Sequence, residues 1–372
     1  MVWKIILVLV VIQLILTLGH VAVFMAMRKF LGIEDLAVQQ KLKIIFLILS
    51  LLPLIASVLV NNFIGSILNG FYYISAVWLG TFHWLCFAGI FSWIIYFVVK
   101  NTGINLPNQY IGLVLFPLAV LISIYGLYNT YQTQVTSYTV KMHNLPDFWQ
   151  GKKVVFLSDT HLGNVRGKSF ITKIAKMASA QNPEIILIPG DFFDGPPADY
   201  EALAKEFMKN TNPNIKVYFS NGNHEEFRQN ELYLSGIRAS GMKILNNQKD
   251  EVNGLQILGT DYFGNGTNEG LQQTLAKIGV EKNKPSILLK HAPNALLAAS
   301  EAGVDLTVSG HTHKGQMWPY GYITKAMFKG YDYGQKAFGD MQVITSSGAG
   351  TWGPPQRVGT KSEIVSILLE KK

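Results

Sequence analysis

The sequence predicts an α/β domain preceded by a membrane region of four helices, and three observations support this prediction. Only 15% of the 372 residues are charged, well below the roughly 25% that is usual in soluble proteins. Residues 36–146 contain no Asp or Glu, so they suit an apolar solvent. After Gly151, short apolar runs alternate with helical stretches, a pattern typical of α/β domains. We therefore expect a membrane region over residues 1–130 and an α/β domain over residues 131–372.

Four stretches are long and apolar enough to cross a bilayer as helices, which requires about 20 mostly apolar residues each. We expect the spans at about Ile5–Met27, Leu42–Val60, Phe71–Val99 and Tyr110–Tyr128. The third is longer than a bilayer requires, so it should tilt or end in the interface. The first is too long for a signal peptide and no small-residue cleavage site follows it before Arg28, so we expect it to be retained.

Lysine and arginine residues near the ends of the spans predict their orientation. Four of these residues lie at the connection between the first and second spans, and one lies between the third and fourth. None lies between the second and third spans. Both basic connections should face the cytoplasm, and four spans then place the α/β domain outside the cytoplasm.

Few polar groups lie well inside the predicted spans. His20 and His83 are the ionisable ones, and we expect them to pack structurally or to lie at an interface. A transporter usually needs more such groups, so we expect the spans to act as an anchor, with a lipid-binding or sensing role as the alternative. Cys86 is the only cysteine, which excludes a scaffold held by intrachain disulfides.

The net charge of +8 does not indicate a nucleic-acid-binding protein. Residues 1–150 carry +4 and the remaining residues carry the other +4, so no single module is strongly basic. The sequence also lacks a cluster in which basic residues alternate with base-stacking aromatic residues. We therefore expect no nucleic-acid partner.

The apolar runs of the second part end in polar residues. Runs of strand length end at Asp159, Asp191, His224, Thr260, His291 and His311. Helical stretches such as residues 169–181 and 199–209 separate most of these runs, and residues 342–345 and 363–369 should add two later strands. Because open sheets present crevices at their strand ends, we expect the functional groups to gather there.

Five short motifs lie at these run ends. In chain order they are Asp-x-His at 159–161, Gly-Asp-x-x-Asp at 190–194, Gly-Asn-His-Glu at 222–225, His291, and Gly-His-x-His at 310–313. Carboxylate and imidazole groups suit divalent transition metals, and two metals about 3.5–4 Å apart clamp the attacking and leaving oxygens of a phosphoryl displacement. Each motif alone is a weak signal, but all five in this order predict a binuclear metal site.

The order of the motifs resembles the calcineurin-like metallophosphoesterase superfamily, and the resemblance covers residues 132–372. Gly315-Gln316 and the Ser-Gly-Ala-Gly sequence at 347–350 are similar to its bacterial membrane-associated branch. Several spans before the domain are similar to transmembrane proteins with a metallophosphoesterase domain. The resemblance implies a four-layer α/β/β/α sandwich of two mixed sheets flanked by helices, in a bacterial cell membrane.

The resemblance also implies that two metals share Asp191 as a bridging ligand. The ligands of the first metal would be Asp159, His161, Asp191 and His313, and those of the second Asp191, Asn223, His291 and His311. We expect two divalent ions, with manganese first and iron or zinc as alternatives. Lys314 stands where this branch often has Gly, a departure that concerns substrate contacts rather than the metal site.

These assignments predict a metal-dependent phosphoric ester hydrolase, either a phosphodiesterase or a phosphatase. A water that bridges two cations has a depressed pKa, so it can attack phosphorus at neutral pH without a separate base. We expect His224 to be the catalytic residue that protonates the leaving oxygen. Asp194 and Glu225 should orient His224 or a ligand imidazole.

The substrate is less clearly indicated. Residues 317–333 mix aromatic side chains with Lys325 and Lys329, a composition that suits either a membrane interface or a packed active-site loop. Because only a short connection joins Tyr128 to the strand at Val135, the domain must stay near the bilayer. We therefore hypothesise a lipid-linked or amphiphilic phosphoester.

Two other functional classes fit the same pattern. The domain could be a non-catalytic scaffold for protein interactions, or it could regulate a membrane sensor or transporter formed by the spans. The presence of His224 together with every predicted ligand favours catalysis.

Overall fold

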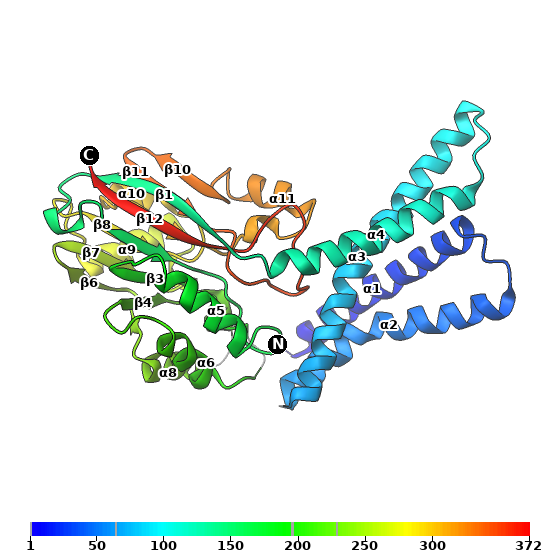
Figure 1. The fold of residues 1–372 in the computed structure, drawn as a ribbon, viewed down its shortest axis with the longest axis horizontal. Helices are drawn as coiled ribbons and strands as arrows, with labels where there is room; N and C mark the ends of the chain where they lie inside the picture. The colour runs from blue at the N-terminus through cyan, green and yellow to red at the C-terminus, as the bar shows by residue number, and fades with distance from the viewer. Residues whose placement is uncertain (1, 64, 195–196, 228–229) are drawn as a thin grey trace. The chain divides into compact units, whose positions relative to one another are not determined.

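The chain divides into two compact units (Figure 1). The computed structural model describes residues 2–63, 65–194, 197–227 and 230–372. The first unit contains Met1–Tyr128 and Gly353–Gln356, and the second contains Asn129–Trp352 and Arg357–Lys372.

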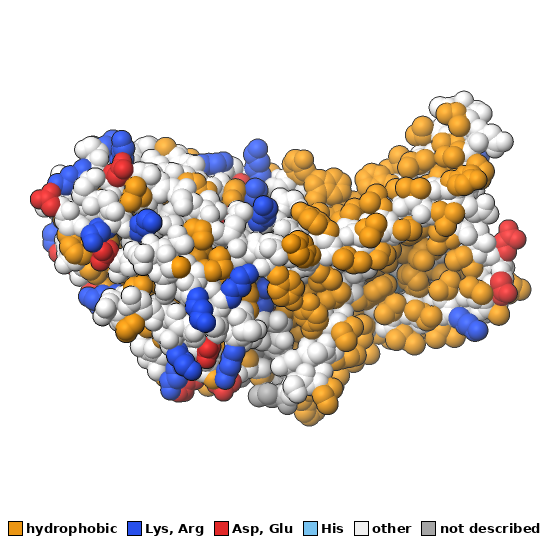
Figure 2. All heavy atoms as spheres, viewed as in Figure 1, with side chains coloured by type: hydrophobic (Ala, Val, Ile, Leu, Met, Phe, Trp, Pro, Cys, Tyr) orange, Lys and Arg blue, Asp and Glu red, His pale blue; other side chains and the backbone are white. Residues whose placement is uncertain are grey.

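The first unit consists mainly of long apolar helices. They are α1 (Val2–Phe30), α2 (Leu36–Asn62), α3 (Ser66–Thr102) and α4 (Asn108–Thr130). All four are long and apolar enough to cross a membrane, as predicted. Figure 2 shows hydrophobic side chains over most of the visible face of these helices. Exposed side chains such as Ile12, Ile48 and Leu121 suit contact with lipid.

Polar groups inside the helical unit find local partners. His20 is buried and stacks on Phe82, with 3.7 Å between the ring centroids. Its Nδ1 donates to the carbonyl of Leu16 (2.8 Å), and its Nε2 accepts from Trp78 Nε1 (3.1 Å). At the start of α2, Asp35 Oδ1 accepts from two backbone N–H groups and caps the helix. His20 therefore has the structural packing role that the sequence predicts.

The second unit contains two six-stranded sheets among its described residues. The first has the order β1 (Gln134–Met142), β12 (Glu363–Lys371), β2 (Lys153–Phe156), β3 (Ile185–Pro189), β4 (Lys216–Ser220) and β5 (Lys243–Ile244). The second has the order β10 (Gly334–Phe338), β11 (Met341–Thr345), β9 (Leu306–Ser309), β8 (Ser286–Leu289), β7 (Leu255–Gly259) and β6 (Gln248–Val252). Both are mixed: β2–β5 pair in parallel, as do β7, β8, β9 and β11, whereas β12, β6 and β10 each make an antiparallel pair.

Helices follow most of the parallel strands. They are α5 (Lys168–Ser179), α6 (Tyr200–Lys209), α7 (Asn223–Phe227), α8 (Asn230–Ser240), α9 (Asn268–Ile278), α10 (Leu296–Glu301) and α11 (Tyr320–Met327). Short 3-10 turns lie at η1 (Asp147–Trp149), η2 (Phe263–Asn265) and η3 (His313–Gly315).

Side-chain alternation along the strands builds the layers. Val154 and Phe156 of β2 pack in one buried cluster with Ile257 and Leu289 of the other sheet, whereas Val155 packs on the opposite face with residues of α5, α6 and α8. The outer face of the second sheet packs against α9 and α10. Because successive strand residues point to opposite faces, each sheet is covered on both sides. The result is the predicted four-layer α/β/β/α sandwich.

Candidate metal centre

The predicted ligands lie just beyond the carboxyl ends of parallel strands. Asp159 and His161 follow β2, and Asp191 follows β3. Asn223 follows β4 as the first residue of α7, His291 follows β8, and His311 and His313 follow β9. Within each sheet, the carboxyl ends of parallel neighbours lie at the same edge, and the grouping of these residues shows that the two edges deliver their side chains to one place.

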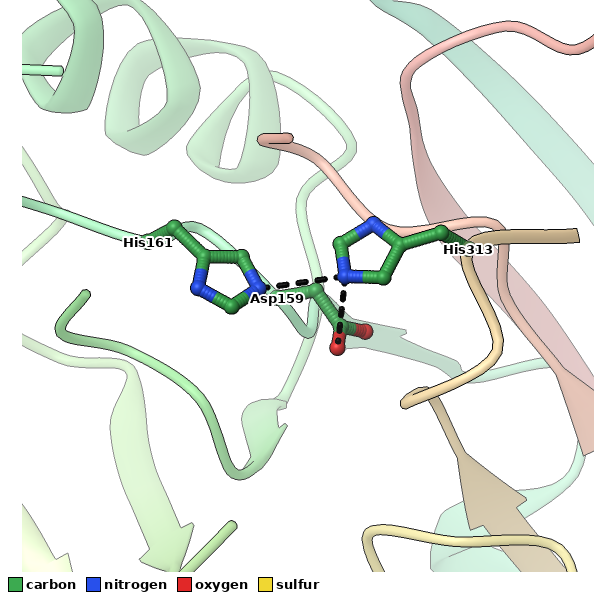
Figure 3. A group of neighbouring side chains, drawn as sticks. All are labelled: Asp159, His161 and His313. Atoms are coloured by element: carbon green, nitrogen blue, oxygen red, sulfur yellow. Dashed lines mark hydrogen bonds and ion pairs between the residues drawn. The ribbon is translucent and has the colours of Figure 1, made fainter. Parts of the chain in front are cut away.

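Asp159, His161 and His313 form the first group (Figure 3). The Nε2 atoms of the two histidines point toward one another and lie 3.1 Å apart. His313 Nε2 lies 3.5 Å from Asp159 Oδ1. All three residues are buried.

A second group contains Asp159, Asp191 and His291. His291 Nε2 lies 3.2 Å from Asp191 Oδ2 and 4.0 Å from Asp159 Oδ1. Asn223 Oδ1 joins this group, at 3.1 Å from His291 Nε2 and 2.9 Å from His311 Nδ1. All seven predicted ligands are thus brought together, although they come from widely separated parts of the chain.

Asp191, a member of the second group, also lies close to the first group. Its Oδ2 is 3.2 Å from His291 Nε2 in one group and 3.8 Å from His161 Nε2 in the other. Burial alone would raise the pKa of Asp191, but the charges of His291, His224 and His161 hold that pKa below its usual range. An ionised carboxylate in this position suits a ligand shared by two cations.

The separations fit a metal site. Ligand atoms at about 2.0–2.2 Å from one ion lie roughly 3 Å or slightly more from each other. The contacts between His161 and His313 (3.1 Å) and between His291 and Asp191 (3.2 Å) match that spacing. The donor set of imidazole nitrogens and carboxylate oxygens is also the set that divalent transition metals prefer.

The backbone is strained where it delivers these side chains. Asp159, His161, Asp191, His311 and His313 all have positive φ, between 47° and 68°. Non-glycine residues rarely adopt this left-handed conformation, and such residues cluster at functional sites. Lys314 has φ 52° as well, so a position where the resemblance expects Gly keeps a backbone conformation that favours Gly.

Two motif glycines are required by close approach to the ligands. A Cβ at Gly310 would lie 2.1 Å from Asp159 Oδ2, and a Cβ at Gly222 would lie 2.2 Å from Asp191 Oδ1. Both distances are far below van der Waals contact. A side chain at either position would displace a predicted ligand.

Comparison with known proteins agrees with this geometry. A family model described as calcineurin-like phosphoesterase matches residues 152–315, which contain all seven predicted ligands. An uncharacterized metallophosphoesterase of Campylobacter jejuni is 32% identical over 260 residues, which cover 68% of this chain and 69% of the relative. The chain belongs to the calcineurin-like metallophosphoesterase family.

Two other metallophosphoesterases are similar over the same share of this chain. One from Aquifex aeolicus, also uncharacterized, is 29% identical over 68% of this chain and 98% of its own length. A transmembrane protein with a metallophosphoesterase domain from Danio rerio is 28% identical over 68% of this chain and 61% of its own length. The family uses divalent metals, and the described residues of this metallophosphoesterase offer a site for them.

His224 lies beside the first group of ligands. Its ring packs edge-on against His161, with 4.7 Å between centroids, and 17% of its side chain is exposed. Its Nδ1 donates to the backbone carbonyl of Asp194 (2.8 Å), which fixes the tautomer and leaves Nε2 unprotonated in the neutral ring. The Asp194 carboxylate lies 3.3 Å from His161 Nδ1, close to the imidazole of a predicted ligand.

The expectation that Glu225 orients an imidazole is wrong. Each of its two carboxylate oxygens accepts two backbone N–H groups, at 2.8–3.1 Å, from Asp191, Phe192, Phe193 and Gly222. Glu225 therefore holds the backbone of two motif loops instead. Burial, aided by the charge of Asp191, raises the pKa of Glu225 to about 7, while these N–H donors oppose that rise.

Arg357 supports the site but was not predicted from the sequence. It is fully buried, and its guanidinium donates to the carbonyls of Ser347 (2.6 Å) and Gly350 (2.7 Å) and to Thr360 Oγ1 (2.6 Å). It also lies 3.4 Å from His313 Nδ1. Burial lowers the pKa of Arg357 to about 9. The sequence around Arg357 did not indicate this role, because a single Arg in a stretch without periodicity is not distinctive. Arg357 also lies outside residues 152–315, which the family model matches.

Proposed function

We propose that this protein is a membrane-anchored phosphoesterase that hydrolyses phosphoester bonds with two divalent metal ions. Manganese is the first candidate for these ions, and iron and zinc are the alternatives. The observation that carries the proposal is the position of Asp191, whose Oδ2 lies within 4 Å of a histidine from each ligand group. A carboxylate shared in this way is what a pair of adjacent cations requires.

The residues would divide between the two ions as follows. The first ion would bind Asp159, His161, Asp191 and His313, and the second would bind Asp191, Asn223, His291 and His311. When bound, the ions would polarise the attacking water and the phosphoryl oxygens. Asn223 contributes a neutral oxygen, which limits the negative charge that an anionic phosphate must approach.

His224 would supply the proton for the leaving oxygen. Its Nδ1 is held by the carbonyl of Asp194, so the ring presents Nε2 away from that contact. Its partial exposure gives it access to a substrate, whereas His161 and His313 are almost completely buried. In the imidazolium form, Nδ1–H would stay bound to this carbonyl while Nε2–H gives its proton to the leaving oxygen, which leaves the neutral ring protonated on Nδ1.

His224→Ala tests the catalytic proposal. The variant should hydrolyse bis-(p-nitrophenyl) phosphate with added manganese about 10²–10⁴-fold more slowly than the wild type, because a general acid contributes that much. Its metal content, measured by elemental analysis, should not change. His143→Ala is the control, since His143 is an exposed histidine outside the site. Equal rates for His224→Ala and the wild type would favour the scaffold function instead.

The substrate that we propose is a lipid-linked or amphiphilic phosphoester. It is supported by the four helices, which are able to span a membrane, and by the exposed aromatic residues near the site. Protein purified in detergent should hydrolyse phospholipids or lipid-linked phosphates in mixed micelles faster than it hydrolyses soluble nucleotides. Much faster hydrolysis of nucleotides would exclude this substrate class.

We further propose that the protein lies in a bacterial cell membrane with the phosphoesterase domain outside the cytoplasm. The basic residues of the two connections support this orientation. An alkaline phosphatase fused to the C-terminus should be active, and a fluorescent protein that folds only in the cytoplasm should stay dark. Fluorescence without phosphatase activity would reverse the orientation.

A further inference from the structure

Helix α11 exposes an unusual number of large apolar side chains. None of its residues is buried, and the exposed fractions are 71% for Tyr322, 55% for Ile323 and 68% for Met327. Trp318, just before the helix, is 42% exposed. The helix thus has an exposed apolar face, although the Phe328 ring just after it packs edge-on against His311, with 5.9 Å between the centroids. Apolar side chains gathered on a surface helix mark a contact site.

A cavity of about 340 Å³ lies behind this helix. One wall is formed by α11 and the residues before it, and the other by Val358, Gly359 and Thr360. The walls are tied together because Trp318 N donates to the carbonyl of Val358 (2.9 Å). The cavity extends to Lys314, which directly follows the predicted ligand His313, so it adjoins the metal centre.

The charge of this region is mainly positive. Lys314 and Lys325 line the cavity, and Lys329 is exposed just after α11. Lys314 Nζ lies 4.0 Å from the centre of the Tyr333 ring. The one carboxylate in the lining, Asp332, is buried and accepts a hydrogen bond from Thr324 Oγ1 (3.2 Å). Basic side chains beside exposed aromatic ones are the composition of a helix that lies at an anionic membrane surface.

Two hydrogen bonds connect the cavity to Asn129, at the start of the second unit. Asn129, in the last turn of α4, belongs to the second unit. Its Nδ2 donates to the carbonyls of Thr360 (2.8 Å) and Arg357 (2.9 Å), and Thr360 lines the cavity. Tyr131, just after α4, is 54% exposed, and tyrosines of this kind are enriched where spans leave the bilayer. The rim of the cavity is thus bonded to Asn129, the first residue of the second unit.

We propose that α11 is an interfacial helix that lies on an anionic lipid bilayer. Trp318, Tyr322, Ile323 and Met327 enter the outer part of the bilayer, and Lys325 and Lys329 contact lipid phosphates. The cavity behind α11 then faces the lipid headgroups. This contact depends on the apolar and basic side chains alone and does not require the proposed hydrolysis.

Fluorescence quenching in vesicles tests the contact with the full-length protein. In a Cys86→Ala background, Ile323→Cys carries an environment-sensitive nitrobenzoxadiazole label, and the protein is reconstituted in phosphatidylcholine–phosphatidylglycerol vesicles with nitroxide lipids. The matched control is Leu232→Cys on α8, which is 53% exposed. The label at residue 323 should be blue-shifted and quenched at least about twofold more strongly than the label at residue 232. Equal quenching at the two positions would overturn the proposal.

Two further outcomes separate the bilayer from other occupants. Lys325→Glu with Lys329→Glu should reduce the quenching at residue 323 in the anionic vesicles, because like charges repel; unchanged quenching would contradict the role of the lysines. A blue shift without quenching by nitroxide lipids would mean that a second copy of the chain covers α11, and that result would also overturn the bilayer as its partner. Circular dichroism and metal content verify that each labelled variant is folded.

Discussion

Asp191→Asn is expected to remove both metal ions and to reduce hydrolysis by roughly 10³-fold or more, since the ions contribute several kcal/mol of transition-state stabilisation. The carboxylate lies 3.2 Å from His291 Nε2 and 3.8 Å from His161 Nε2. An amide has only one oxygen to offer and no negative charge, so it cannot neutralise two adjacent cations. Elemental analysis of the purified protein measures the loss of metal directly, and hydrolysis of bis-(p-nitrophenyl) phosphate measures the loss of activity.

The fold should survive this substitution. Asp191 Oδ1 accepts a hydrogen bond from the backbone N–H of His224 (2.9 Å), and an Asn side-chain oxygen can accept the same bond. Asp340→Asn is the matched control, because Asp340 is almost fully exposed and pairs only with Lys372 at 3.8 Å among the described residues. If Asp191→Asn retained both metals, the bridging role would be wrong. If it retained one, Asp191 would be a ligand of a single ion.

The five motifs could be located because each lies at the end of a strand-length apolar run, whereas the choice of seven ligands among their residues came from the family resemblance. Parallel strands place their carboxyl ends at one edge of a sheet, so Asp159 and Asp191, which follow neighbouring strands, could be expected to meet. His313 follows a strand of the other sheet, and its approach to Asp159 depends on how the two sheets pack. The four helices that are able to span a membrane could be predicted because span length and apolar composition are local properties. The four-layer arrangement came only from the family resemblance, since alternation along one strand does not reveal what covers each face.

Glu225 and Arg357 show what the sequence could not reveal. Both act on backbone groups: Glu225 accepts from the N–H groups of loops near residues 191–193 and 222, and Arg357 donates to carbonyls at residues 347 and 350. Any backbone offers such groups, so no residue type or spacing marks the partner. Glu225 was expected to orient an imidazole because an imidazole fixes its tautomer through its other nitrogen, and nothing in the sequence pointed to the backbone groups instead.

Glu225→Gln is expected to have the largest effect on folding stability. The two carboxylate oxygens accept four backbone N–H groups, and Gln would replace one of these oxygens with an NH₂ group that can only donate. Two buried N–H groups would then face a donor and lose their acceptor, which costs roughly 1–3 kcal/mol for each unsatisfied group. We expect the melting temperature in detergent to fall by several degrees, as measured by differential scanning fluorimetry.

The same substitution should also weaken metal binding. One carboxylate oxygen of Glu225 accepts the N–H groups of both Asp191 and Gly222, so its loss would free the backbone that positions the predicted ligand Asp191. Asp191 holds a left-handed conformation, with φ 51°, and the bonds to Glu225 offset part of that strain. Glu231→Gln is the control, since Glu231 is a largely exposed glutamate that pairs with Arg238. Loss of stability without loss of metal would mean that the loop at Asp191 keeps its conformation without the bonds to Glu225. Equal melting temperatures for Glu225→Gln and Glu231→Gln would show that the four bonds contribute nothing to folding.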